Sequence, residues 1–161
     1  MDHLKYFLGT GLYSGALPKA PGTFGSLAVT ALIFGLIQAQ IYGAILILLI
    51  LASLISLWVS GYFEDTFGKD PGCLVMDEWA GQSLVFIGIS FSGDLQTDLT
   101  LLAAGFLLFR FFDILKPLGI KKVQDIGGKW GILTDDLLAG LFALICLKSL
   151  IFVGPSVFGM V

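Results

Sequence analysis

Charge is scarce in this chain of 161 residues. Only 13% of the residues are charged, 57% are hydrophobic, and the mean hydropathy is +0.94. Soluble domains carry about 25% charged residues, so the composition predicts an integral membrane protein. The length fits one membrane-embedded domain of several spans over residues 1–161 and leaves no room for a separate globular domain.

Other scarce residue types exclude several kinds of chemistry. His3 is the only histidine and lies outside the polar motifs, which argues against a phosphohistidine mechanism or a Ser-His-Asp triad. Cys73 and Cys146 form no CxxC pair, so zinc would lack its usual ligands and no disulfide framework is indicated. Nine Lys and Arg among twelve Asp and Glu make no basic face for nucleic acid. The glycine-interrupted N-terminus, with Asp2, is unlike a cleavable signal peptide, and we expect it to belong to the mature protein.

Five apolar runs predict an all-α integral membrane protein. They cover approximately residues 24–39, 42–63, 79–91, 99–115 and 136–153. As a helix, the third run would be about 20 Å long, shorter than the roughly 30 Å hydrocarbon core. It could form a half-span, a tilted or buried helix, or the front of a longer broken helix. We therefore expect a compact bundle of about four to five transmembrane or partly spanning helices.

The positive charges predict how this bundle is oriented. With five crossings, residues 1–23, 64–78 and 116–135 lie on one side of the membrane, and the two remaining links lie on the other. Those two links contain no Lys or Arg. Seven lysines fall on the first side: Lys5, Lys19, Lys69, Lys116, Lys121, Lys122 and Lys129. By the positive-inside rule, the first side is cytoplasmic.

Four polar stretches converge on the cytoplasmic ends of these runs. They are LPKAPGTFGS (17–26), VMDEWAGQ (75–82), FRFFDILKP (109–117) and TDDLLAG (134–140). Charged side chains are unfavourable in hydrocarbon, so they usually face a bundle interior or a polar cavity and mark functional sites. The convergence predicts a polar site at the cytoplasmic face of the bundle.

Five carboxylates in these stretches predict a divalent cation site. They are Asp77, Glu78, Asp113, Asp135 and Asp136. Acids packed together without a metal would repel one another, and Mg²⁺ favours a few carboxylates together with water and a substrate phosphate. We expect the ion to polarise a phosphoryl oxygen and activate a water, with a spare carboxylate as the base. Arg110 or Lys116 would steady the charge of the leaving phosphate.

The stretch LPKAPGTFGS predicts a phosphate-binding loop before a helix. Its glycines let backbone N–H groups approach an anion, the helix N-terminus offers unpaired donors, and the lysine adds positive charge. The candidate residues are Lys19, Gly22, Thr23 and Ser26. The stretch is not a P-loop, because it lacks the GKS/T ending.

Two of the motifs also have a purely structural interpretation. If 109–117 is helical, Arg110 and Asp113 lie at i and i+3 and can neutralise each other. Thr134 suits an N-cap, which would put Asp135 and Asp136 in the first turn, where the helix dipole favours carboxylates. The cap does not explain why Asp136 shares a face with small residues further along, which would let a neighbouring helix come close.

In this order, the four motifs closely resemble the phosphatidylglycerophosphatase A family of bacterial membrane phosphatases. The resemblance covers about residues 9–145. It implies Mg²⁺-dependent hydrolysis of the terminal phosphate of phosphatidylglycerophosphate, giving phosphatidylglycerol and inorganic phosphate at the inner membrane. The family's motifs fall on Asp77 and Glu78, on Arg110, Asp113, Lys116 and Pro117, and on Asp135 and Asp136. The implied partners are the phospholipid substrate and the bilayer, with the oligomeric state left open.

Two other functions are compatible with the same charges. A small transporter or ion-conducting bundle would use them as its pathway, although the carboxylates gather at one face and the far side offers only Asp94 and Asp98. A lipid phosphotransferase is also metal-dependent and built on aspartates, but its D-G-x2-A-R…G-x3-D-x3-D pattern is absent from this chain.

Overall fold

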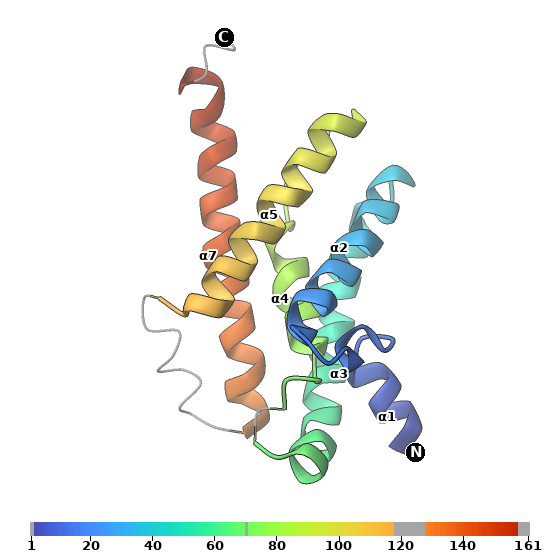
Figure 1. Ribbon diagram of the computed structural model, residues 1–161. Helices are drawn as coiled ribbons and strands as arrows, with labels where there is room; N and C mark the ends of the chain where they lie inside the picture. Colours follow the sequence, from blue (N-terminus) through green and yellow to red (C-terminus); the bar gives the residue numbers. More distant parts are fainter. Residues whose placement is uncertain (1, 70, 118–127, 158–161) are drawn as a thin grey trace.

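The apolar runs of the sequence form helices, as predicted. The computed structural model describes residues 2–69, 71–117 and 128–157, and this part of the chain contains helices and no strand. The elements are α1 (Asp2–Gly9), the 3-10 helix η1 (Ser14–Ala16), α2 (Pro21–Gln38), α3 (Gly43–Phe67), α4 (Met76–Val85), α5 (Leu95–Leu115) and α7 (Gly128–Val157). Figure 1 shows α2, α3, α5 and α7 as long helices with the shorter α4 among them. The predicted all-α bundle is confirmed.

Three helices of the described residues are long and apolar enough to cross a membrane. They are Pro21–Gln38, Gly43–Phe67 and Trp130–Val153. Less than half of each span is buried inside the bundle, and large apolar side chains such as Leu32, Leu54 and Ile145 are exposed on it. Such a wide apolar surface requires lipid around it. α5 has the length of a span but is charged near both ends and is not among the three.

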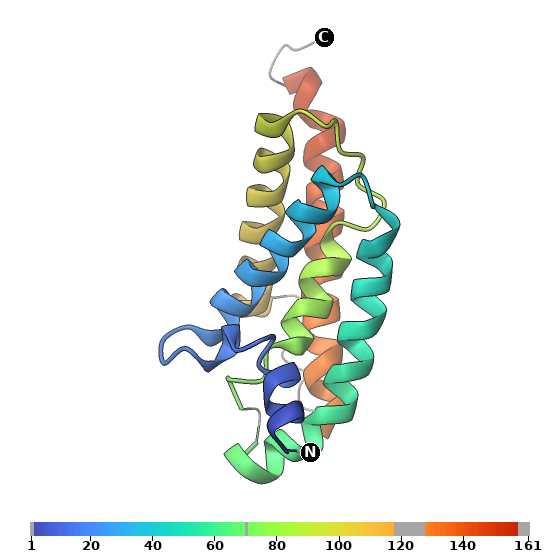
Figure 2. The ribbon, with the colours of Figure 1, turned by 90° about the vertical axis from the view of Figure 1, so that its right-hand side faces the viewer.

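The third apolar run forms a short helix and not a full span. α4 begins three residues earlier than the predicted run and ends at Val85, so its 10 residues make a helix of about 15 Å. Gly88, with a φ of 66°, then takes a left-handed conformation that turns the chain away from the helix. Residues 86–94 lead on to the start of α5 (Figures 1 and 2). The segment is therefore a half-length helix whose path is completed by an irregular connection.

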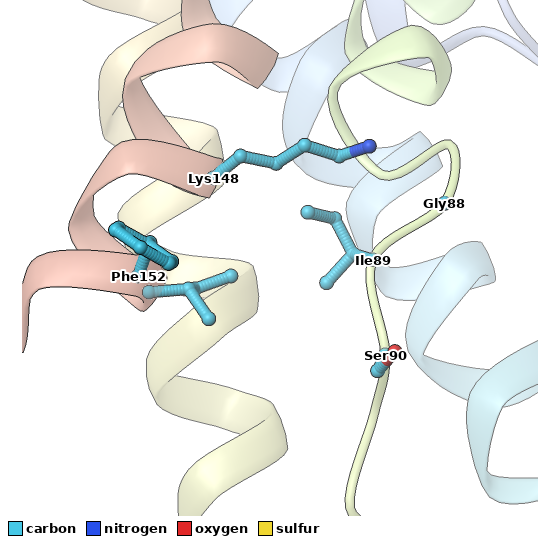
Figure 3. Close-up of a pocket in the computed structure, with 6 residues that line it drawn as sticks. Gly88, Ile89, Ser90, Lys148 and Phe152 are labelled. Carbon is cyan, nitrogen blue, oxygen red and sulfur yellow. The ribbon is translucent and has the colours of Figure 1, made fainter. Parts of the chain in front are cut away.

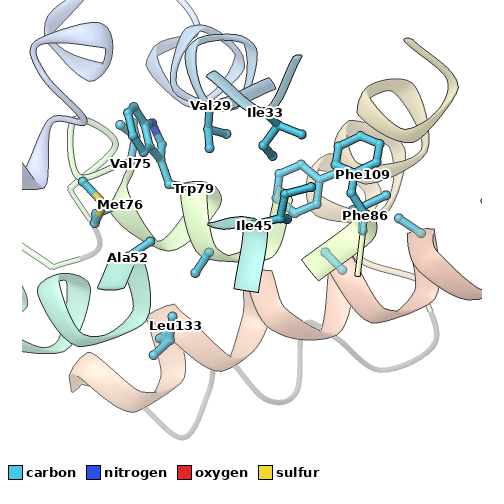
Figure 4. Close-up of a cluster of buried hydrophobic side chains, with 14 of the residues drawn as sticks. Val29, Ile33, Ile45, Ala52, Val75, Met76, Trp79, Phe86, Phe109 and Leu133 are labelled. Carbon is cyan, nitrogen blue, oxygen red and sulfur yellow. The ribbon is translucent and has the colours of Figure 1, made fainter. Parts of the chain in front are cut away.

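α4 lies at the centre of the bundle. Eight of its ten residues are buried, and it packs against α2, α3, α5 and α7. Its apolar side chains join those of its neighbours in one cluster, shown in Figure 4, which includes Val29, Ile33, Ala52, Val75, Met76, Trp79, Phe86, Phe109 and Leu133. The core thus surrounds the helix that carries the VMDEWAGQ motif.

The ends of the helices are arranged as the charge pattern predicted. The starts of α2 and α4, the end of α5 and the first half of α7 lie toward one end of the bundle, whereas the α2–α3 link and the start of α5 lie at the other (Figure 1). Lys121 and Lys122 lie outside the described residues. Lys148 is a cation on α7 that the loop pattern did not count. It extends toward Gly88 in a pocket that also contains Ser90 and Phe152 (Figure 3).

The N-terminal helix α1 packs against the end of α3. The ring of Tyr6 stacks on Phe63 with centroids 6.0 Å apart, and the Nζ of Lys5 lies 5.5 Å from the ring centroid of Tyr62. The backbone N–H of Val75 donates to the carbonyl of Gly9 at 2.9 Å. Through this hydrogen bond, α1 also positions Val75, the residue that precedes α4.

Candidate active site

Two acids at the start of α4 and one acid of α7 form what we call the acidic cluster. Asp77, Glu78 and Asp136 each present a carboxylate oxygen, and these oxygens lie within 4.8 Å of one another. Asp77 and Asp136 are buried, and Glu78 is partly buried. The first turn of α4 adds the positive end of its helix dipole beside Asp77 and Glu78. The structure thus brings three of the five predicted metal ligands together.

Two glycines allow α4 and α7 to approach closely enough to form this cluster. A Cβ at Gly81 would lie 2.5 Å from the carbonyl oxygen of Asp136, and a Cβ at Gly140 would overlap the carbonyl oxygen of Gly81. Ordinary contacts of a Cβ begin at 3.4 Å. The close helix approach predicted beside Asp136 is confirmed, and it depends on the absence of a side chain at both positions.

The structural alternative in which Thr134 caps the last helix is wrong. α7 begins at Gly128, so Thr134 and the two aspartates lie about two turns inside it. The helix extends back to this point because Ile132 and Leu133 are buried in the bundle, and tertiary packing overrides a local capping signal. Asp135 and Asp136 are 4% and 5% exposed, so they face the protein interior and do not serve the helix dipole.

Arg110 links the acidic cluster to the start of α2. Its Nη1 lies 2.6 Å from Oδ2 of Asp113, which confirms the predicted pair, and also donates to Oγ of Ser26 at 3.3 Å. The Ser26 hydroxyl donates to the carbonyl of Gly22 at 2.8 Å. A Cβ at Gly22 would overlap Oε1 of Glu78 and lie 3.3 Å from Nη1 of Arg110. The guanidinium therefore lies between α2 and the cluster.

Lys116 and Asp135 form a second ion pair beside the cluster. Lys116 follows the last residue of α5 and lies outside the candidate spans. Burial acts to lower the pKa of Lys116, but its hydrogen bond with Asp135 and the charge of that carboxylate outweigh burial and raise it. Asp113 and Asp135 thus each form an ion pair with a basic side chain. No basic side chain among the described residues forms an ion pair with the acidic cluster.

The acidic cluster can hold a metal ion. Asp77 lies at the start of α4, outside the candidate spans, and burial raises the pKa of its carboxyl to about 7, with the charge of Asp113 acting in the same direction. Oε2 of Glu78 is buried and has no hydrogen-bond partner in the part of the chain that the structure describes. A cation among these oxygens would offset the repulsion between the three carboxylates and would give Oε2 of Glu78 a partner. Carboxylate oxygens suit a hard divalent ion.

The predicted phosphate-binding loop is only partly assembled at the cluster. α2 begins at Pro21, so Gly22 and Ser26 belong to its first two turns and adjoin Arg110. Thr23 is half-buried, and Lys19 is exposed and forms no ion pair with another described residue. The structure therefore joins two of the four predicted residues to the site.

Gln82 is a polar residue of this region to which the sequence assigned no role. Its side chain is completely buried, and neither amide atom has a hydrogen-bond partner among the described residues. It follows Glu78 by four residues, so both lie on the same face of α4. The spacing of four residues between Glu78 and Gln82 could have indicated that Gln82 belongs to the site, since a buried glutamine in a short apolar helix needs a polar partner.

The fold and the site define a class of protein, a helical membrane bundle that gathers buried carboxylates and an arginine near one end. The chain matches the family described as phosphatidylglycerophosphatase A over residues 7–151. It belongs to this family of phosphatases, as its motifs predicted.

Relatives from three bacteria cover most of the chain. The phosphatidylglycerophosphatase A of Haemophilus influenzae is 38% identical over 144 residues, which cover 87% of this chain and 84% of the relative. The phosphatidylglycerophosphatase A of Escherichia coli is 30% identical over 147 residues, which cover 89% of this chain and 81% of the relative. A relative from Bacteroides thetaiotaomicron, provisionally named a phosphatidylinositol-3-phosphatase, is 35% identical over 146 residues, 88% and 90% of the two chains. No solved structure matches the chain significantly.

Proposed function

We propose that this protein hydrolyses the terminal phosphate monoester of phosphatidylglycerophosphate, releasing phosphatidylglycerol and inorganic phosphate, in a reaction that requires Mg²⁺. The family and the names of two relatives support the activity. The observation that carries the proposal is the acidic cluster beside Arg110. Buried carboxylates that bind a cation, next to a guanidinium that binds phosphate oxygens, are the two components that such a hydrolysis needs.

The residues of the site divide into cation-binding and phosphate-binding groups. Asp77, Glu78 and Asp136 would hold Mg²⁺, which when bound polarises a phosphoryl oxygen and lowers the pKa of a water. Arg110 would bind the phosphate oxygens, and its pairing with Asp113 fixes the orientation of the guanidinium.

The remaining residues would position the phosphate and move the proton. Lys116, held by Asp135, would add positive charge for the leaving phosphate. Gly22 and Ser26 would shape the phosphate side of the site at the start of α2. A carboxylate of the cluster would accept the proton of the attacking water.

We place this site at the cytoplasmic face of a bacterial inner membrane. α1, which carries Lys5, and the end of α3, which precedes Lys69, lie at the same end of the bundle as the start of α4 (Figure 1), and basic residues favour the cytoplasmic side. The relatives with the same family name are bacterial. A lipid phosphate at headgroup level would reach the acidic cluster while its acyl chains remain in the bilayer.

A second substrate is favoured by the name of one relative. The Bacteroides protein carries the name of a phosphatidylinositol-3-phosphatase, and that lipid also presents a phosphate monoester at headgroup level. The acidic cluster and Arg110 suit either lipid phosphate, so the two substrates must be compared directly.

The test measures inorganic phosphate released by the purified protein in detergent, with Mg²⁺ and with EDTA. Asp113→Asn should abolish release because it frees Arg110 from its partner, and Asp65→Asn, an exposed acid on α3, is the matched control. Release from phosphatidylglycerophosphate that is lost with EDTA and with Asp113→Asn supports the proposal. Faster release from phosphatidylinositol 3-phosphate would support the second substrate. No release from either lipid by well-folded protein would refute hydrolysis and favour the transport alternative.

A further inference from the structure

An apolar groove leads away from the site between α2 and α5. It has a volume of about 340 Å³, and its walls include Leu27, Ala31 and Phe34 of α2 and Leu99, Ala103 and Phe106 of α5. Leu27 directly follows Ser26, and Phe106 lies one turn before Arg110 on α5. The end of the groove formed by Leu27 and Phe106 is therefore the end nearer the hydrogen bond from Arg110 to Ser26.

The wall of the groove is apolar along its length. Thr30 also lines it, but its hydroxyl donates to the carbonyl of Ser26 at 2.7 Å and is thus satisfied within its own helix. Leu27 is 50% exposed and Leu99 is 46% exposed, so the groove is open to the surroundings of the bundle. Because α2 is a candidate membrane span, these surroundings are lipid.

We infer that this groove holds an acyl chain of the lipid substrate, an inference that rests on the proposed function. From residue 27 to residue 34 the groove follows α2 for about 10 Å. α2 itself runs away from the end of the bundle at which α4 starts (Figures 1 and 2). A phospholipid whose phosphate lies at Arg110 directs its acyl chains along this path toward the membrane interior. Because this groove leads from the end of α2 that adjoins Arg110, the proposed phosphate ligand, its occupant is a lipid chain and not a helix of a second copy.

Filling the groove tests this assignment. Ala31→Phe adds a ring from α2, and Ala31 is exposed, so the ring does not displace the core. We expect kcat/KM for long-chain phosphatidylglycerophosphate to fall about tenfold, because roughly two methylene groups lose their contact with protein. Turnover of an analogue with two very short acyl chains should stay unchanged. Leu32→Phe, at the next and also exposed position, is outside the groove lining and should leave both substrates unaffected.

Ala103→Phe narrows the groove from the α5 wall and should reproduce the effect, with circular dichroism showing that each variant is folded. Wild-type kcat/KM for the long-chain lipid in both variants would overturn the assignment, and so would an equal loss with both substrates. A change of oligomeric state in light scattering, without a change in chain-length dependence, would show that a second copy occupies the groove.

A binding measurement separates failure of this assignment from failure of the proposed function. Phosphatidylglycerol with a photoactivatable acyl chain, in nanodiscs, should cross-link to peptides containing Phe34 or Leu99, and Ala31→Phe should reduce that labelling several-fold. Labelling in a protein that releases no phosphate would support the groove and refute only the activity. Labelling spread evenly over all exposed helix faces would overturn the groove.

Discussion

Gly140→Ala tests the helix contact on which the acidic cluster depends. The added Cβ would overlap the carbonyl oxygen of Gly81, and the reciprocal Cβ at Gly81 would lie only 2.5 Å from the carbonyl oxygen of Asp136. Because ordinary contacts begin at 3.4 Å, we expect α4 and α7 to separate by roughly 1 Å. Backbone atoms form this contact, so no side-chain rotation can relieve the overlap.

The separation should affect activity more than stability. Overpacking a tight contact destabilises a protein by about 1–3 kcal/mol, whereas alanine is better than glycine within a helix by about 0.5–1 kcal/mol. The net loss of folding free energy should then be about 1–2 kcal/mol. A displacement of about 1 Å between catalytic groups can lower the rate about 100-fold, since Asp136 would move away from Asp77 and Glu78.

Thermal unfolding in detergent and phosphate release from phosphatidylglycerophosphate measure the two effects. Gly61→Ala in α3 is the matched control, because a Cβ there meets nothing within 4 Å, and it should keep both wild-type activity and at least wild-type stability. A Gly140→Ala protein with unchanged melting temperature and unchanged phosphate release would show that the cluster does not need the glycine contact.

Three further substitutions address the charges of the site. Asp136→Asn should lower phosphate release about 100-fold or more, because it removes a proposed ligand of the metal ion. It should not lower the melting temperature, because it also removes the repulsion between Asp136 and the carboxylates of Asp77 and Glu78. A large drop in melting temperature would contradict this. Arg110→Lys should lower kcat about tenfold, since an ammonium lacks the planar pair of donors with which a guanidinium binds phosphate oxygens; unchanged steady-state kinetics would refute it. Asp135→Asn should lower the melting temperature at about pH 8. Because the pKa of Lys116 is raised in the folded protein, the pair stabilises the fold below the ordinary lysine pKa of 10.5 and is lost as pH rises through the folded value. The difference from wild type should therefore shrink as the pH rises above 10.5 in a pH series of melts, and a constant difference would contradict the pairing.

The sequence located the acidic site because helix direction follows from the order of the apolar runs. Asp77 and Asp136 are 59 positions apart, yet the distribution of lysines placed both at the same end of the bundle. The periodicity of the helix also related Arg110 to Asp113, and the small residues beyond Asp136 indicated the close approach that Gly81 and Gly140 make.

The division of the acids into paired and unpaired groups could not be predicted in this way. Asp135 and Asp136 are adjacent in sequence, but successive residues of a helix point about 100° apart. Asp135 therefore meets Lys116 of the α5 end, while Asp136 meets Asp77 and Glu78 of α4. The positions of two different neighbouring helices therefore decide which of the two carboxylates gains a cationic partner.

The shortness of α4 follows from its position inside protein instead of lipid. A spanning helix facing hydrocarbon needs about 20 apolar residues, whereas α4 has 10 residues and buries Gln82 and Ser83 completely. Irregular backbone at membrane depth is tolerated only where protein or a polar cavity surrounds it, and α2, α3, α5 and α7 surround α4. The same enclosure buries Asp77 and partly buries Glu78 at the first turn of the helix. A longer α4 at the lipid surface would satisfy the membrane but would remove the enclosure that brings the three carboxylates together.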